Sequence, residues 1–341
     1  MPHDLIAFAN DRFPHPTYLR LSRKFMRFVL FLILGAATAL GQIPKPPWTG
    51  GTAPAGRTAP ADPTFKVDVK LVNVFTTVTD DHGAPIAHLT KDDFSLLEDG
   101  NPQQIAVFDR DSALPLSIVL DIDTSLSTRK DLPLELTSAR RFAHAILRPQ
   151  DALSLYEFSE IVDEVVPFTA DLKEIDHGIS HVHEGAATAL YDAIYLGSQA
   201  LEKRQGRKVM VIITDGGDTV SKINYQEALR AAQEAEAIVY SIIDVPIEAS
   251  AGRDLGGEHA LIQIAADTGG KYFYATNVPQ LDDAFREISD ELRTQYLLAY
   301  YPTHRLADSD FRRLEVKVTS PGGANYKVRH RAGYYTSRGG F

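Results

Sequence analysis

Three oxygen-bearing side chains follow an apolar run near the middle of the sequence. Residues 116–120 are mostly apolar and partly β-branched, as in a strand that is buried on both faces. The chain then presents Asp123, Ser125 and Ser127, an acid and two hydroxyls at alternate positions. These hard oxygen donors suit Mg²⁺, which uses one or two carboxylates and leaves room for water or an outside oxygen. The pattern predicts one part of a metal-dependent ligand site at a strand end.

Two later segments present the same kinds of oxygen. Residues 208–214 form a second buried-strand pattern, and Asp215 follows it as Asp123 follows the first. Thr188 stands where a small-residue loop opens a helix, a position at which a threonine ordinarily caps the helix. An α/β sheet places its ligand chemistry at the carboxyl ends of its strands. We therefore expect the three segments to meet at one edge.

The segment between residues 114 and 295 alternates strand and helix patterns. After the opening strand, the patterns predict strands over 152–158, 162–168, 208–214, 237–243 and 271–274, and helices over 133–147, 189–202, 225–236, 258–267 and 278–293. Such alternation predicts an α/β fold: a doubly wound, mostly parallel, Rossmann-like sheet with helices on both faces. The strands 152–158 and 162–168 are close enough to form a hairpin, which gives one antiparallel edge strand.

Both flanks of this segment show strand patterns without helices. The N-terminal flank predicts a strand or bulged pair over 65–78 and a hairpin of 94–97 with 103–108; the C-terminal flank predicts strands over 296–301, 314–319 and 326–330. Three or four strands alone bury little surface and would be only marginally stable. We expect the two flanks to pair into one β-sandwich with the α/β domain inserted; two independent β domains are the alternative.

The resulting domain plan has six parts. It assigns 1–41 to a signal peptide, 42–64 to a Pro/Gly-rich linker, 65–112 and 295–336 to the two β segments, 113–294 to the α/β domain, and 337–341 to a tail.

The first 41 residues have the features of an export signal. Basic residues precede the apolar run 28–34, and Ala37 and Ala39 fit a small-residue cleavage pattern, with Met26 as an alternative start. A permanent membrane anchor is disfavoured because a span needs about 20 apolar residues. We therefore expect an exported protein in the periplasm, in the cell envelope or secreted, without a stable membrane span after cleavage.

Composition narrows the chemistry further. The chain has no cysteine, which excludes disulfides and thiolate sites. Its formal charge is -10, and loss of residues 1–41 removes five basic and two acidic residues, which gives -13. An acidic protein of this kind is a poor partner for nucleic acid and attracts cations.

The three oxygen-bearing segments together resemble the von Willebrand factor A (VWA) domain and its metal-ion-dependent adhesion site (MIDAS). The family motif D-x-S-x-S corresponds to Asp123, Ser125 and Ser127, its threonine to Thr188, and its later aspartate to Asp215. The resemblance implies Mg²⁺, with Mn²⁺ or Ca²⁺ as alternatives, held by these five residues directly or through water. It also implies a non-enzymatic adhesion or protein-interaction module whose partner, a protein or surface ligand, presents an Asp or Glu carboxylate to the metal.

The wider layout resembles the VWFA-related family of exported acidobacterial proteins. The segments that carry this resemblance are 71–83 and 93–100 before the α/β domain and 296–302 after it. One departure from most such sites is Leu126, which stands where a glycine is usual.

Two other interpretations use the same residues. Asp121 and Asp123 after an apolar strand are similar to the first motif of Mg²⁺-dependent haloacid-dehalogenase-type phosphatases, in which one aspartate is the nucleophile. Against it, Asp121 falls within the strand and is expected to hydrogen-bond to a neighbouring loop. A metal-free structural VWA module is the other alternative.

His181 and His183 are expected to be exposed polar residues.

Overall fold

The structure is a computed structural model that describes residues 71–110, 114–128, 131–244, 255–303, 311–319 and 325–336. The chain divides into two compact units, 1–64 and 65–341, and all described residues belong to the second. The expected signal peptide, linker and tail lie outside the described residues. Among the helices that are described, none is both long and apolar enough to cross a membrane.

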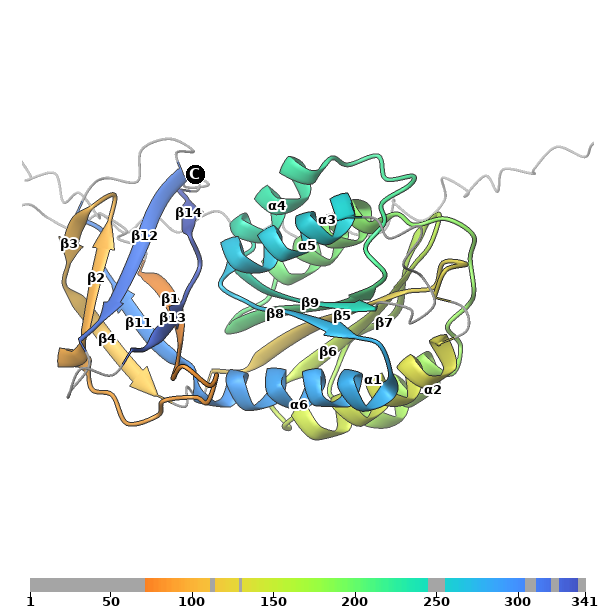
Figure 1. Ribbon diagram of the computed structural model, residues 1–341, viewed down its shortest axis with the longest axis horizontal. Helices are drawn as coiled ribbons and strands as arrows, with labels where there is room; N and C mark the ends of the chain where they lie inside the picture. Colours follow the sequence, from red (N-terminus) through yellow and green to blue (C-terminus); the bar gives the residue numbers. More distant parts are fainter. Residues whose placement is uncertain are drawn as a thin grey trace, which may run out of the picture. The chain divides into compact units, whose positions relative to one another are not determined.

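A six-stranded sheet forms the centre of the α/β domain (Figure 1). Its strand order is β10-β9-β8-β5-β6-β7, and every neighbouring pair is parallel except β6 with β7. The strands are β5 (Leu116–Asp123), β6 (Ala152–Phe158), β7 (Val162–Thr169), β8 (Arg207–Thr214), β9 (Ala237–Asp244) and β10 (Tyr272–Ala275). The predicted parallel sheet with one antiparallel edge strand is confirmed.

Six helices cover the two faces of this sheet. They are α1 (Leu132–Ile146), α2 (Leu172–Ile179), α3 (Leu190–Glu202), α4 (Tyr225–Glu234), α5 (Leu255–Thr268) and α6 (Val278–Thr294). One apolar core joins the sheet to α1, α2 and α6, and a second joins its other face to α3, α4 and α5 (Figure 1). The predicted double winding is confirmed.

The flanking strands form two four-stranded sheets, β13-β1-β11-β4 and β14-β12-β2-β3. Their bounds are β1 (Val72–Thr79), β2 (Phe94–Glu98), β3 (Asn101–Gln103), β4 (Ile105–Arg110), β11 (Tyr296–Tyr300), β12 (Phe311–Val318), β13 (Lys327–Arg329) and β14 (Gly333–Tyr335). Side chains of both sheets share one buried core. N-terminal strands pair directly with C-terminal ones, β1 with β11 and β2 with β12, so the predicted joint sandwich is confirmed.

The predicted hairpin of 94–97 with 103–108 is wrong except at Gln103, which pairs with Leu96. β2 pairs with β3, but β4 leaves that sheet and pairs with β11 of the other. Pro102 in β3 cannot donate a ladder hydrogen bond, which suits a short edge strand. Ile105 then enters the sandwich core, where it is 6% exposed.

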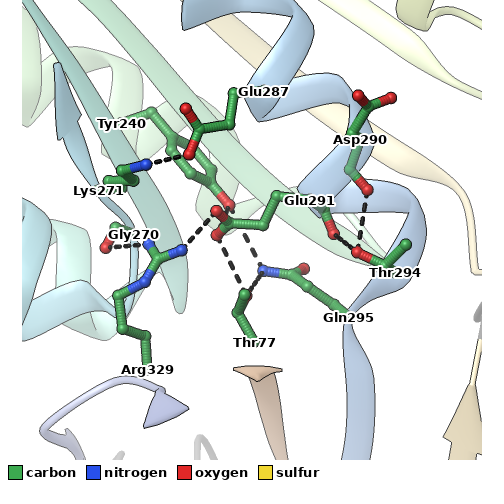
Figure 2. A network of polar contacts seen from close by, with 10 residues as sticks. All are labelled: Thr77, Tyr240, Gly270, Lys271, Glu287, Asp290, Glu291, Thr294, Gln295 and Arg329. Carbon is green, nitrogen blue, oxygen red and sulfur yellow. Dashed lines mark hydrogen bonds and ion pairs between the residues drawn. The ribbon is translucent and has the colours of Figure 1, made fainter. Parts of the chain in front are cut away.

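The sandwich meets the α/β domain through Glu291 on α6 (Figure 2). This side chain is 3% exposed. Its carboxylate accepts hydrogen bonds from Thr77 of β1 at 3.1 Å and Tyr240 of β9 at 2.8 Å, and it pairs with Arg329 of β13. A buried carboxylate is stable only when its oxygens are bonded in this way. The network therefore fixes the junction through which α6 continues, after Gln295, into β11.

We expect Glu291→Gln to lower the free energy of unfolding by about 1–3 kcal/mol, because it removes a charge-assisted bond and leaves Arg329 without its partner. Urea denaturation followed by circular dichroism measures the loss. The matched control is Glu287→Gln on the same helix, whose ion pair with Lys271 is partly exposed and is expected to contribute less than about 1 kcal/mol. Equal losses in both variants would contradict a special role for Glu291.

Candidate functional site

Asp123 ends the central strand β5 and is completely buried. Its Oδ2 accepts a hydrogen bond from the Thr214 hydroxyl at 2.6 Å, and its Oδ1 accepts one from the Ser125 backbone N–H at 2.9 Å. Burial raises the pKa of Asp123 to about 6; the bonds from Thr214 and Ser125 oppose this rise, and the negative charge of Asp215 adds to it. The carboxylate is thus held in a fixed position, and no cationic group is among the causes that shift its pKa.

The loop after β5 brings two serine hydroxyls together. Ser125 is 2% exposed whereas Ser127 is exposed, and their Oγ atoms lie 3.1 Å apart. The Thr128 hydroxyl donates to the carbonyls of Asp123 and Ser125 at 3.0 and 3.1 Å, which closes the loop. Leu126, 57% exposed, points out of this turn and does not fill it.

The loop that carries Thr188 is bound to the loops of its neighbours. The Gly185 N–H donates to the Thr124 carbonyl at 2.8 Å. Thr188 donates its N–H to the Thr219 hydroxyl at 2.9 Å and accepts the Thr219 N–H at 2.8 Å. Because Thr124 follows β5 and Thr219 lies beyond the end of β8, these bonds bring all three predicted segments to one edge of the sheet.

Thr188 does not have the capping role that is usual at such a junction. The N-cap residue of α3 is Ala189, and no side chain makes a capping hydrogen bond there. Thr188 is nevertheless 5% exposed. Its side chain is therefore available for another role at this edge.

Asp215 follows β8 directly and is half-buried. The next residue, Gly216, has a φ of +100°, a conformation that favours glycine, and its N–H donates to the Thr214 hydroxyl at 3.1 Å. Thr214 thereby joins the turn after β8 to Asp123. Sequence reasoning proposed Asp215 but did not assign this linking role to Thr214.

The donors at this edge fit a hard divalent cation. Asp123 receives a hydrogen bond at each oxygen, which leaves Ser125, Ser127 and Thr188 as neutral hydroxyl donors beside two carboxylates. Adjacent ligands of an octahedral Mg²⁺ with bonds of about 2.1 Å lie about 3.0 Å apart, and the two serine oxygens are 3.1 Å apart. In the described ranges, no three His, Asp or Glu side chains are grouped as metal ligands, so any cation here depends on the hydroxyls.

Four residues that support this edge were not proposed from the sequence as site residues. They are Thr128, Glu160, Thr214 and Thr219. Glu160 accepts the N–H groups of Ala186 at 2.8 Å and Ala187 at 3.3 Å, and these bonds lower its pKa to about 2. The available signal was weak: three threonines and one glutamate, each in a loop or at the end of a strand, are common in such places.

Asp121 differs from the expectation. It is completely buried, but neither of its carboxylate oxygens has a hydrogen-bond partner, so the expected bond to a neighbouring loop is wrong. It faces α3, where a Cβ added to Gly197 would lie 3.4 Å from its Oδ2. Burial raises its pKa well above the ordinary value. Asp121 thus packs against α3, and no donor among the described residues reaches it.

The two histidines lie outside this edge. The His181 ring is hydrogen-bonded to the His177 carbonyl at 2.7 Å, and the exposed His183 lies 3.5 Å from a carboxylate oxygen of Glu157. Both side chains are exposed, as expected from the sequence.

The domain is a doubly wound α/β domain. Hydroxyl and carboxylate side chains gather at the carboxyl edge of its central strands, where proteins of this fold class bind their ligands. Residues 118–217, which include all five predicted ligands, match the family model of the von Willebrand factor type A domain. The chain therefore contains a von Willebrand factor type A domain. A sequence search of curated proteins finds no match.

Several solved structures resemble the chain at low identity. The von Willebrand factor type A protein from Catenulispora acidiphila is 12% identical with a TM-score of 0.48, over 70% of this chain and 73% of that one. The conserved hypothetical protein BatB from Bacteroides thetaiotaomicron is 20% identical with a TM-score of 0.42, over 52% and 100%. The vWF domain of the type V pili tip protein Mfa5 from Porphyromonas gingivalis is 13% identical with a TM-score of 0.43, over 52% and 95%. Such distant likenesses do not say what this chain binds.

We expect Asp121→Leu to raise the free energy of unfolding by about 1–3 kcal/mol, because leucine has the same branched shape and removes an unsatisfied buried carboxyl. The raised pKa means that folding takes up a proton at Asp121, so wild-type stability falls as the pH rises above about 4, where the unfolded side chain ionises. The gain from leucine should grow over the same range. Thermal denaturation between pH 4 and 8 measures it.

The shape-matched control is Asp121→Asn, which keeps an unsatisfied polar group in the core. It should stabilise less than leucine at every pH. A loss of stability in the leucine variant would show that Asp121 has a favourable partner after all.

Proposed function

We propose that this protein is an exported, non-enzymatic adhesion or interaction protein that captures a partner's carboxylate through a divalent cation at the β5 edge. The cation would be held by Asp123, Ser125, Ser127, Thr188 and Asp215. One observation carries the proposal: Thr188 is nearly buried, does not cap its helix, and is bonded into the same group of loops as Asp123 and the two serines.

Each side chain has a distinct part in this proposal. Hydrogen bonds from the Thr214 hydroxyl and the Ser125 N–H hold Asp123 in position. Its carboxylate would supply negative charge close to the cation. Ser125, Ser127 and Thr188 offer neutral oxygens, which neutralise less of a cation's charge than carboxylates would. A bound Mg²⁺ would supply one electrophilic position that an outside Asp or Glu oxygen can fill. Ser127 is exposed, so the edge is open to a partner.

The raised pKa of Asp123 supports a cation at this edge. A buried carboxylate beside a second one is costly unless positive charge compensates it. No Lys, Arg or His in the described residues is paired with Asp123. Mg²⁺ fits the short distance between the two serine oxygens and the small number of carboxylates. Mn²⁺ or Ca²⁺ could bind the same oxygen atoms.

The position of Asp121 argues against the phosphatase interpretation, in which this residue would be the nucleophile. Asp121 is completely buried against α3, so it cannot reach a phosphate ester, and the same burial raises its pKa and disfavours the ionised form that would attack. This supports the assignment of the protein as a binding module.

Export is part of the proposal because of the sequence of residues 1–41. A basic stretch, an apolar run and small residues at the end form an export signal. The partner would then be an envelope or extracellular protein or surface ligand that presents an acidic group.

Calorimetric titration of the full chain with MgCl₂ tests the metal. We expect saturable binding that weakens at least about tenfold in Asp123→Ala, Ser125→Ala and Thr188→Ala, because each variant removes a ligand or the residue that orients it. Thr137→Ala is the matched control, since its exposed hydroxyl only donates to the Pro133 carbonyl on α1. Asp121→Asn should also bind normally.

Absence of Mg²⁺, Mn²⁺ and Ca²⁺ binding to the folded wild type would leave a metal-free structural module. Turnover of para-nitrophenyl phosphate that is lost in Asp121→Asn would instead establish a phosphatase.

A further inference from the structure

A cavity of about 350 Å³ lies at the carboxyl edge of the sheet, on the face covered by α1 and α6. It is bounded by the first turns of these two helices and by the ends of β8, β9 and β10. Ile213, Ile242 and Leu281 supply apolar walls. None of the five predicted metal ligands lines it, so it is separate from the β5-edge site.

Three carboxylic acids line this cavity: Asp131, Glu135 and Asp244. Glu135 is 3% exposed; the Asp244 side chain interacts with its carboxyl, and no other described group donates a hydrogen bond to it. Asp131 is the N-cap residue of α1, yet its side chain makes no capping hydrogen bond. Acids at a helix start usually satisfy the backbone there, so their placement around a cavity is not explained by capping.

The electrostatics of the cavity favour positive charge. Its lining, as far as the structure describes it, contains no Lys, Arg or His. The positive end of the α1 dipole stabilises a nearby carboxylate only weakly. Burial, reinforced by the charges of Asp244, Asp123 and Asp131, dominates instead and raises the pKa of Glu135 to about 9. A cationic ligand would compensate the negative charge of the ionised acids, which the helix end offsets only weakly.

We infer that this cavity binds an organic cation: an ammonium or guanidinium group on a short apolar stem, with the charge against Glu135 and the stem against Ile213, Ile242 and Leu281. Glu135 gives up its proton to solvent when the cation binds, and its buried carboxylate, which faces the cavity, then supplies the charge-assisted acceptor. The apolar walls supply contact for carbon atoms.

A metal ion fits the same cavity less well. No three of the described acidic or histidine side chains are grouped as metal ligands. A hydrated Mg²⁺ or Ca²⁺ would also place its waters against isoleucine and leucine side chains. The volume is within the range of about 300–1,000 Å³ that is typical of small-molecule pockets.

Calorimetric titration of the full chain with n-butylammonium and n-butylguanidinium tests the inference. We expect at least one of them to bind, and n-butanol, which has the same stem without the charge, to bind at least about tenfold more weakly. Glu135→Gln should weaken binding of the cation about tenfold or more. Glu174→Gln, an exposed acid on α2, is the matched control and should have no effect.

Asp131→Asn is a second variant in case Glu135→Gln does not fold. Asp131 is exposed at the start of α1, so its substitution should spare the fold and still weaken the cation several-fold. MgCl₂ titrations of the same variants separate the two sites: Glu135→Gln should keep the Mg²⁺ binding expected of the β5 edge.

Three outcomes would overturn the inference. Neither cation binds; n-butanol binds as tightly as n-butylammonium; or Ca²⁺ binds in a way that Glu135→Gln abolishes, which would make the cavity a metal site. The source of the cation is settled by a blocked lysine, N-acetyl-lysine methylamide. Binding of this compound would indicate a side chain of a protein partner, and binding of the free amines alone would indicate a small-molecule ligand.

Discussion

The candidate site at the β5 edge depends on one buried carboxylate, Asp123, which is hydrogen-bonded to the loops after β5 and β8. Parallel strands bring their carboxyl ends to one edge, and β5 lies between β6 and β8 in the middle of the sheet. The Thr214 hydroxyl and the Ser125 N–H each bind one oxygen of Asp123, so the loops after β5 and β8 are positioned by the same group. Thr188 joins them because its loop bonds to residues that follow both strands.

Unbalanced acidity surrounds this edge. Asp121 lies two residues before Asp123 on β5 and has no hydrogen-bond partner, and on the other side of the sheet Glu135 has only the acidic side chain of Asp244 as a polar partner. Burial raises the pKa of all three carboxyls. Such groups cost folding free energy unless a cation or a proton compensates them. Asp121 is out of reach of a ligand, whereas Asp123 lies at the β5 edge and Glu135 lines the cavity; the Glu291 network at the sandwich junction, by contrast, is fully paired.

The pattern of apolar residues was sufficient to predict the sheet and five of its six covering helices, since long periodic segments such as α6 encode their buried face directly. The short helix α2 was missed because it buries only Ile175, Gly178 and Ile179, too few positions to show a period. β14 was missed because Gly333 suggests a turn, whereas a Cβ there would lie 2.1 Å from the Arg312 carbonyl oxygen, so the close strand approach needs glycine. β4 could not be placed because local turn signals do not show which sheet a strand enters.

Predictions for the site divide in a similar way. Residues that follow strong strands, Asp123 and Asp215, could be placed on one edge from topology alone. The supporting bonds of Thr214 and Thr219, and the isolation of Asp121, depend on side-chain packing between segments about 30 to 90 residues apart, which no local pattern encodes. The cavity beside Glu135 has the same origin, because α1 and α6 are distant in sequence.

The most direct test of a cation at the β5 edge is anomalous X-ray scattering from crystals grown with Mn²⁺, which replaces Mg²⁺ at oxygen sites and can be located without reference to the protein phases. A single anomalous peak at bonding distance from the hydroxyl oxygens of Ser125, Ser127 and Thr188 is the expected result. A fully occupied peak elsewhere, or an edge without any peak in crystals saturated with Mn²⁺, would contradict it.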